Sequence, residues 1–187
     1  MRRFAWLLLA ALPALAQGTP LTTAAREGLL ELLAAPGGAY HSYALYTKVL
    51  SILGPAEPYR HLLDGERTKL DAVRERLATY GVAHPAKNPY LGTIRLPRTA
   101  EAIARFALAQ EVRSVYLERR LKRVFTGYAD LAELVRVLEA ADQAQASLLR
   151  MAIAQGGVLG ADAVRGLARK MATDPACTFV FGKGLCR

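Results

Sequence analysis

The chain has 187 residues and a formal net charge of +9, and 52% of its residues are hydrophobic while only 7% are aromatic. This length suits one domain with a small appendage. The basic residues are scattered along the chain rather than gathered into runs. A composition rich in Ala, Leu and Arg and poor in aromatic residues disfavours a sheet protein, so we expect an all-α domain.

The first 16 residues have the pattern of a secretory signal peptide. Arg2 and Arg3 precede an apolar run, residues 4–15, and an Ala-x-Ala ending stands before Gln17. The run is too short for a comfortable membrane span, although an uncleaved anchor is the alternative. We expect cleavage after Ala16, export to the periplasm or the exterior, and no transmembrane anchor in the mature chain. Cleavage would lower the net charge from +9 to +7.

Residues 17–38 are predicted to form a linker and a first helix, with Thr22 or Thr23 as its cap. Residues 39–155 follow as the main domain, in which apolar spacing predicts four longer helices at 39–53, 58–81, 99–125 and 130–155. An irregular stretch rich in Pro and Gly, residues 82–98, separates the second helix from the third. The layout predicts an all-α four-helix bundle with one long crossover and short flanking helices.

Residues 156–187 are predicted to add a short helix at 161–171 and a loop closed by a disulfide. Both cysteines, Cys177 and Cys186, lie in the last eleven residues. An even pair at the tail of an exported chain is typical of a disulfide. The residues between them form a hairpin or an irregular clasp. Metal ligation by the two thiols is the alternative, but it is disfavoured because no His lies near them.

Polar residues interrupt the apolar faces of the predicted bundle helices. Glu66 and Lys69 point the same way as Leu62, Leu70 and Val73. A buried charge without a partner is costly, so these two charges on a core face need an explanation. The polar residues on the core faces of the later helices are Glu111, Glu118, Asp142 and Gln145.

Four segments carry a resemblance to a known family: Ala39-Tyr-His-Ser-Tyr-Ala-Leu-Tyr46, Glu66-Arg-Thr-Lys-Leu-Asp-Ala-Val73, Leu77-Ala-Thr-Tyr-Gly81 and Ala109-Gln-Glu-Val-Arg-Ser-Val-Tyr-Leu-Glu118. Over about residues 38–155 the chain resembles the ferritin-like superfamily, in particular a bacterial ferritin-like domain related in layout to rubrerythrin. The resemblance implies a bundle core that holds a metal with Glu from two helices and Glu-x-x-His from the other two.

The ligand set that this resemblance implies is incomplete. The family has a Glu where this chain has Ala39, and Lys69 stands at a His position. The last motif is Asp142-x-x-Gln145, again without His. A protonated Lys has no lone pair for a metal and repels a divalent cation. The residual candidate metal ligands are Glu66, Glu111 and Asp142.

We therefore expect Lys69 to replace the metal as the internal cation, balanced by carboxylates and hydrogen-bonded to Gln145. Two alternatives remain. The carboxylates still bind iron or manganese, or Lys69 extends to solvent while Glu66 lies at the edge of the apolar face. The predicted buried polar network consists of Glu66, Lys69, Glu111, Asp142 and Gln145.

Two other groups of side chains were considered for a role near this network. Tyr43 and Tyr46 are expected to point inward, either as core residues or as hydrogen-bond donors to the carboxylates. The three histidines, His41, His61 and His84, are assigned to the surface or to loops, and their spacing assembles no metal cluster.

Basic residues are frequent in residues 111–123, on the third bundle helix. They predict either an anionic partner, such as nucleic acid, lipid head groups or an envelope polymer, or a solvated face. Pairs such as Glu118 with Lys122 favour the solvated face. A homodimer is the other association considered.

The sequence thus predicts an exported helical bundle with a structural or binding role in the cell envelope, no catalytic residue and no resident cofactor. The alternative function is a ferritin-like metal-binding protein. It would be an oxidoreductase or a metal store that uses the residual carboxylates with iron or manganese.

Overall fold

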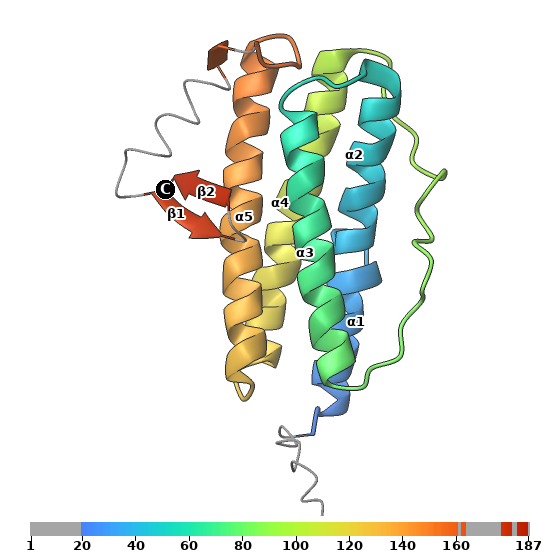
Figure 1. The fold of residues 1–187 in the computed structure, drawn as a ribbon, viewed down its shortest axis with the longest axis vertical. Coiled ribbons are helices and arrows are strands. Elements are labelled where there is room, and N and C mark those ends of the chain that lie inside the picture. The colour runs from blue at the N-terminus through green and yellow to red at the C-terminus, as the bar shows by residue number, and fades with distance from the viewer. Residues whose placement is uncertain (1–19, 161, 164–176, 181–182, 187) are drawn as a thin grey trace, which may run out of the picture.

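The structure is a computed structural model that describes residues 20–160, 162–163, 177–180 and 183–186. The predicted signal peptide, and most of the helix predicted at 161–171, lie outside the described residues. The described part is a helical bundle with a small hairpin beside it (Figure 1). This confirms the predicted all-α class. The helices are α1 Thr23–Ala34, α2 Ala39–Leu53, α3 Tyr59–Thr79, α4 Ala100–Val124 and α5 Ala129–Ala154.

The crossover, residues 80–99, runs along the outside of the bundle from the end of α3 to the start of α4 (Figure 1). Helix α2 packs mainly against α3, and α4 against α5. Because the crossover returns the chain to the other end, α3 and α4 run in the same direction while each pair is antiparallel. This is the predicted layout of helix pair, long crossover and helix pair.

Hydrogen bonds hold the crossover against α2 and the end of α1. The Tyr40 hydroxyl donates to the carbonyl of Pro85. Asn88 Nδ2 donates to the carbonyl of Tyr40 at 2.7 Å, and the Tyr90 hydroxyl donates to the carbonyl of Ala34 at 2.7 Å. All three acceptors are backbone carbonyls, so hydrogen bonds to the main chain help to fix the crossover against the helices.

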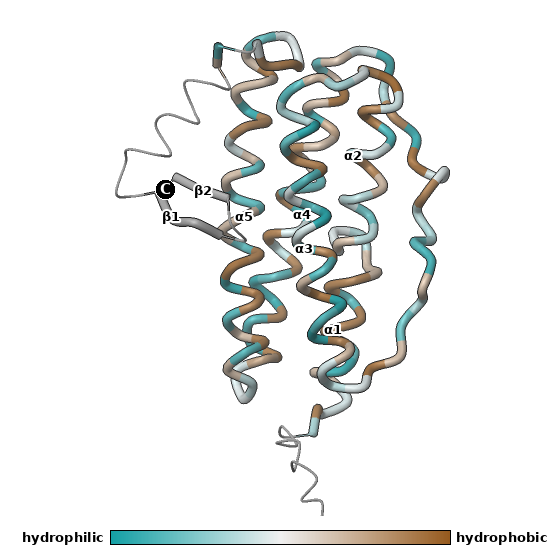
Figure 2. The backbone as a smooth tube through the Cα atoms, in the orientation of Figure 1, coloured by the Kyte–Doolittle hydropathy of each residue, from teal (hydrophilic) through white to brown (hydrophobic). Residues whose placement is uncertain are grey.

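Local sequence explains where the helices begin. Thr22 and Thr99 precede α1 and α4, and their side-chain oxygens accept hydrogen bonds from the N–H groups of Ala25 and Ala102, each at 3.2 Å. Such N-caps satisfy backbone donors that the first turn leaves free. Hydrophilic and hydrophobic residues alternate along the helices (Figure 2), as expected for helices with one buried face. In the described part of the chain, no helix combines the length and apolar character that crossing a membrane requires.

The apolar core consists of two clusters. On α3 the change from one cluster to the other falls between Leu62 and Leu70, and on α5 it falls between Leu138 and Leu148. We call the cluster that includes α1 the proximal core and the other the distal core. The intervening positions hold the polar residues singled out from the sequence. The largest side chains of the proximal core are Leu29, Leu33, Tyr40, Leu77, Leu121, Phe125 and Leu131, and those of the distal core are Leu45, Tyr46, Tyr59, Leu62 and Ile103.

Two short strands, β1 Cys177–Val180 and β2 Lys183–Cys186, pair in antiparallel fashion. The register sets Cys177 directly opposite Cys186. Of the two shapes considered for this segment, the hairpin is confirmed. The side chains of both strands lie outside the described residues.

The turn after α5 contains two glycines with positive φ, Gly156 at +80° and Gly157 at +107°. A Cβ atom on Gly157 would overlap with the backbone carbonyl of Ala100 at the start of α4. A Cβ atom on Gly156 would meet nothing within 4 Å. The two positions therefore share a backbone conformation but differ in the space around them.

Gly157→Ala is expected to lower the free energy of unfolding by at least about 3 kcal/mol, because a backbone collision is added to left-handed strain. Gly156→Ala is the matched control. Gly156→Ala introduces the left-handed strain without a collision, so it is expected to lower the free energy of unfolding by only about 1 kcal/mol. Guanidinium unfolding followed by circular dichroism measures both losses. Equal losses would contradict the close packing of this turn on α4.

Candidate functional site

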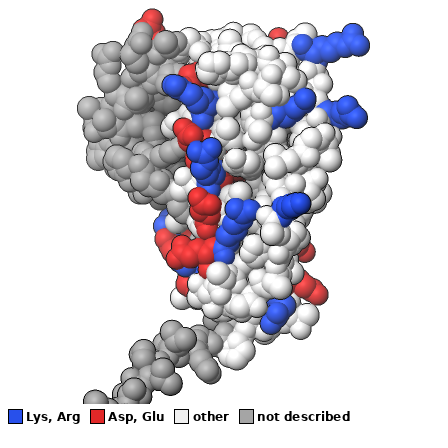
Figure 3. All heavy atoms as spheres, turned by 45° about the vertical axis from the view of Figure 1, so that its right-hand side comes forward, with Lys and Arg blue, Asp and Glu red and all other residues white. Residues whose placement is uncertain are grey.

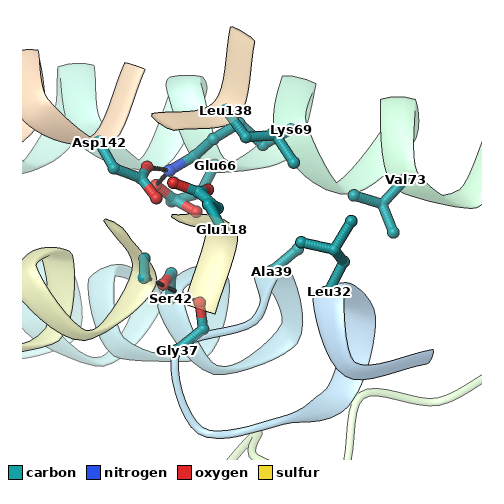
Figure 4. A pocket seen from close by; sticks show the side chains of 11 residues that line it. Leu32, Gly37, Ala39, Ser42, Glu66, Lys69, Val73, Glu118, Leu138 and Asp142 are labelled. Carbon is teal, nitrogen blue, oxygen red and sulfur yellow. Dashed lines mark hydrogen bonds and ion pairs between the residues drawn. The ribbon is translucent and has the colours of Figure 1, made fainter. Parts of the chain in front are cut away.

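Lys69 is buried in the core with 4% of its surface exposed, and its ammonium contacts three side chains, of which Figure 4 shows Glu66 and Asp142. The Nζ atom pairs with Glu66 Oε1 on the same helix and with Asp142 Oδ1 on α5. It also donates a hydrogen bond to Gln145 Oε1 at 2.7 Å. The alternative in which Lys69 extends to solvent is therefore wrong, and Glu66, with 0% exposure, does not lie at the edge of the apolar face.

Helical spacing places these contacts. Glu66 and Lys69 are three residues apart on α3, and so are Asp142 and Gln145 on α5, so each pair shares one face of its helix. Gly65 leaves room for the amide of Gln145, since a Cβ atom at that position would lie 2.8 Å from Gln145 Nε2. The absence of a side chain at Gly65 thus permits the close approach of α5.

Helix α4 adds two buried carboxyl groups, Glu111 with 0% and Glu118 with 4% exposure. The Tyr46 hydroxyl donates a hydrogen bond to Glu111 Oε1, which confirms the second of the two roles considered for Tyr46. Glu118 is directed into the cluster beside Asp142, whose negative charge it feels (Figure 4). The predicted surface pair between Glu118 and Lys122 is therefore wrong. We call the assembly the Lys69 cluster; its members are Glu66, Lys69, Glu111, Glu118, Asp142 and Gln145.

Four carboxyl groups thus surround one ammonium. Burial raises the pKa of Glu66 to about 7, and Lys69 opposes this shift. Burial also raises the pKa of Glu111 well above its usual value despite Lys69, and burial with the adjacent Asp142 charge does the same for Glu118. Burial lowers the pKa of Lys69, but Asp142 and Glu66 outweigh it, so the net pKa is raised. Protons therefore neutralise part of the excess negative charge at neutral pH.

Buried hydroxyl and amide groups extend this polar layer, and the sequence interpretation did not include them. Gln110 Nε2 donates to Ser42 Oγ at 3.3 Å, and Ser114 Oγ donates to the carbonyl of Gly37 at 2.8 Å. The spacing of Gln110, Glu111 and Ser114, which share a face of α4, was the signal that could have identified them.

A cavity of about 10 Å³ borders the Lys69 cluster. This volume suits about one water molecule. Figure 4 shows Ser42 and Ala39 on one side of it and Glu66, Glu118 and Lys69 on the other. The resemblance aligns Ala39 with a position that holds a Glu ligand in the ferritin-like family. In this chain the methyl group of Ala39 forms part of the apolar lining of the cavity.

The three residual ligand candidates do meet in space. Glu66, Glu111 and Asp142 each offer an oxygen atom, and these atoms all lie within 4.8 Å of one another. Carboxylate oxygens grouped in this way suit a divalent cation. However, the Lys69 ammonium contacts two of the three carboxylates and would repel such an ion. The residues therefore do not fit a metal while Lys69 is charged and in place.

His41, which was assigned to the surface or a loop, is half-buried on α2. Its ring meets the ring of Tyr90 edge-on, with 4.9 Å between the centroids, because the crossover covers this side of α2. Burial, followed by the charge of Arg113, lowers the pKa of His41. A neutral histidine packed against the crossover is a structural residue here.

Three of the six basic residues of α4 form ion pairs, and one of them is Arg105 with Glu101. Arg119 Nε lies 2.7 Å from Glu139 Oε1, and Arg120 pairs with Glu31. On the face that Figure 3 shows, Lys and Arg side chains stand singly or beside Asp and Glu, without a continuous basic patch. These pairs favour the solvated helix face over an anionic partner.

Lys69→Met is expected to lower the free energy of unfolding by about 3–5 kcal/mol at neutral pH, because it leaves buried carboxylates without a cation. Methionine keeps an unbranched chain, so the loss reports mainly the charge. Lys48→Met, at an exposed position on α2, is the control and is expected to change stability by about 0.5 kcal/mol at most. Urea unfolding of both variants tests this. A loss at Lys69 as small as that at Lys48 would contradict the ion network.

Stability is expected to fall as pH rises through neutrality. The pKa of Glu66 is raised from 4.5 to about 7, so between these values the folded chain binds more protons than the unfolded chain. The free energy of unfolding then decreases with pH, by up to about 3 kcal/mol for this group. The pKa values of Glu111 and Glu118 are also raised, so these groups change the stability in the same direction. Unfolding at about pH 5 and about pH 8 measures the effect, and Glu66→Gln should reduce it.

Comparisons with protein-family models, with curated proteins and with solved structures find no match to this chain. Its relation to known bundles consequently rests on the sequence segments quoted above and on the helical layout.

Proposed function

We propose that this chain is an exported ferritin-like bundle with a non-catalytic structural or binding role in the cell envelope, in which Lys69 takes the place of a metal ion. The observation that carries the proposal is the position of Lys69 Nζ between Glu66 and Asp142. A fixed ammonium supplies the positive charge that buried carboxylates require. It does so without dependence on metal supply.

The dimensions of the site support a non-catalytic role. The cavity that borders the Lys69 cluster measures about 10 Å³, which leaves no room for a substrate. The Lys69 ammonium, the only cation in the cluster, is already paired with Glu66 and Asp142 and hydrogen-bonded to Gln145. A cluster arranged in this way sets the relative positions of α3, α4 and α5.

The ferritin-like assignment is supported by two features. The order of the helices is pair, long crossover, pair, which is one of the known bundle topologies. The segments that carry the resemblance also contribute residues to one place, since Tyr46, Glu66, Lys69, Glu111 and Glu118 all lie in or against the Lys69 cluster.

Export is supported by the signal-peptide pattern of residues 1–16. A disulfide between Cys177 and Cys186 is supported by the strand register. Directly opposed residues in antiparallel strands have Cα atoms about 4.5–5.5 Å apart. This falls within the range of about 4.4–6.8 Å found for disulfides.

Metal binding is a second candidate function, favoured by the convergence of Glu66, Glu111 and Asp142 oxygens within 4.8 Å. It requires the Lys69 side chain to leave the cluster or lose its proton. Iron or manganese would then be held by carboxylates alone, as in a metal store or an oxidoreductase.

Metal analysis separates the two functions. Wild-type protein purified after supplementation with iron and manganese is expected to contain far less than one metal ion per chain. Lys69→His restores the Glu-x-x-His spacing and removes the fixed charge at neutral pH, so it is expected to gain metal. Lys69→Arg keeps the positive charge, so it serves as the control and is expected to gain no metal. Stoichiometric iron or manganese in the wild-type protein would favour the second candidate and overturn the first.

A further inference from the structure

The Lys69 cluster holds the two reactants of an amide-forming condensation in contact. Lys69 on α3 provides a primary amine and Asp142 on α5 a carboxyl group, and Nζ touches Asp142 Oδ1 (Figure 4). Both residues are buried, with 4% and 2% exposure. Groups held together in this way can reach effective concentrations of about 10⁵–10⁸ M when they are well aligned.

We infer that Lys69 and Asp142 condense to an isopeptide bond that crosslinks α3 to α5. The new bond joins Lys69 Nζ to Asp142 Cγ, and the bond that breaks joins Cγ to a carboxyl oxygen, which leaves as water. An ammonium and a carboxylate thus become a neutral amide and one water, so no oxidant, reductant or cofactor is needed. The inference rests on the proposed function, in which Lys69 is an ammonium in the newly folded chain. Once the pair condenses, the neutral amide replaces this ion pair as the link between α3 and α5.

Two neighbouring carboxyl groups are placed to move the protons. Glu66 Oε1 contacts the same Nζ atom, so it can take a proton from the ammonium and free the lone pair that attacks Cγ. Glu118 lies beside Asp142 (Figure 4), so it can protonate the oxygen that leaves. The ammonium loses two protons in total and the departing water carries both. Glu66 and Glu118 therefore end in the protonation states in which they began.

The surroundings of the pair favour the amide over the ions. In water the separate ions are well solvated, whereas in the core both pay a desolvation penalty that a neutral amide avoids. Partners for the product are already in place. Gln145 Oε1, 2.7 Å from Nζ, can accept the amide N–H, and Glu118 can donate to the amide oxygen. Scarcity of water in the core also protects the bond from hydrolysis.

Mass spectrometry of the full mature chain, reduced and denatured, tests the inference. The wild-type chain is expected to be about 18 Da lighter than its sequence, the mass of one water, whereas Lys69→Arg should show its full mass. A tryptic digest should contain residues 68–74 joined to residues 137–150, because trypsin does not cleave after an acylated lysine. Asp142→Asn should lose about 17 Da as ammonia and give the same linked product.

Glu118→Gln tests the placement of the acid, since it keeps a hydrogen-bond donor but cannot deliver a proton in the same way. It is expected to slow the appearance of the linked peptides at least about tenfold in newly folded protein. An unchanged rate would overturn the role of Glu118. Full sequence mass and complete cleavage after Lys69 in long-incubated wild-type protein would overturn the crosslink itself. That result would leave the ion network intact, because the network is tested separately by the stability of Lys69→Met.

Discussion

The middle of this bundle depends on one ammonium buried among four carboxyl groups. Each of the three longest helices contributes at least one of these groups, and the apolar residues lie on either side of them in the proximal and distal cores. A charge in such a place tolerates little displacement, since a lost contact leaves an uncompensated ion in a dry core. The cluster therefore specifies the register of α3, α4 and α5, while the apolar cores supply most of the driving force.

The same oxygen atoms can be satisfied by a proton, an ammonium or a metal ion, but by one of these at a time. Lys69 contacts Glu66 and Asp142, and burial raises the pKa of Glu111 and of Glu118, which favours their protonated forms. Charge balance is thus achieved with components of the chain and with protons from solvent. In the proposed role, a core of this kind would hold its helices together without a metal ion.

Much of the fold could be predicted because its signals are local. The spacing of apolar residues, together with Thr caps and Pro and Gly stops, gave helix bounds that agree with the structure within one or two residues. The shared face of Glu66 and Lys69 followed from helical geometry in the same way.

The positions that could not be predicted are those that depend on tertiary packing. Glu118 satisfies a local rule for pairing with Lys122 but lies against Asp142, and His41 is covered by a crossover whose path has no local signal.

Gly65 marks the place in α3 at which local opening of the helix would admit solvent to the Lys69 cluster. Glycine inside a helix costs about 1 kcal/mol relative to alanine, because its backbone gains the most freedom when it unfolds. Gly65, which makes room for Gln145, therefore also lowers the local stability of α3. It precedes Glu66 directly in the sequence. Local opening of α3 at this point would let solvent reach groups that are otherwise sealed. The rate at which the core exchanges protons with its surroundings would then be set by the helix backbone rather than by the acids themselves.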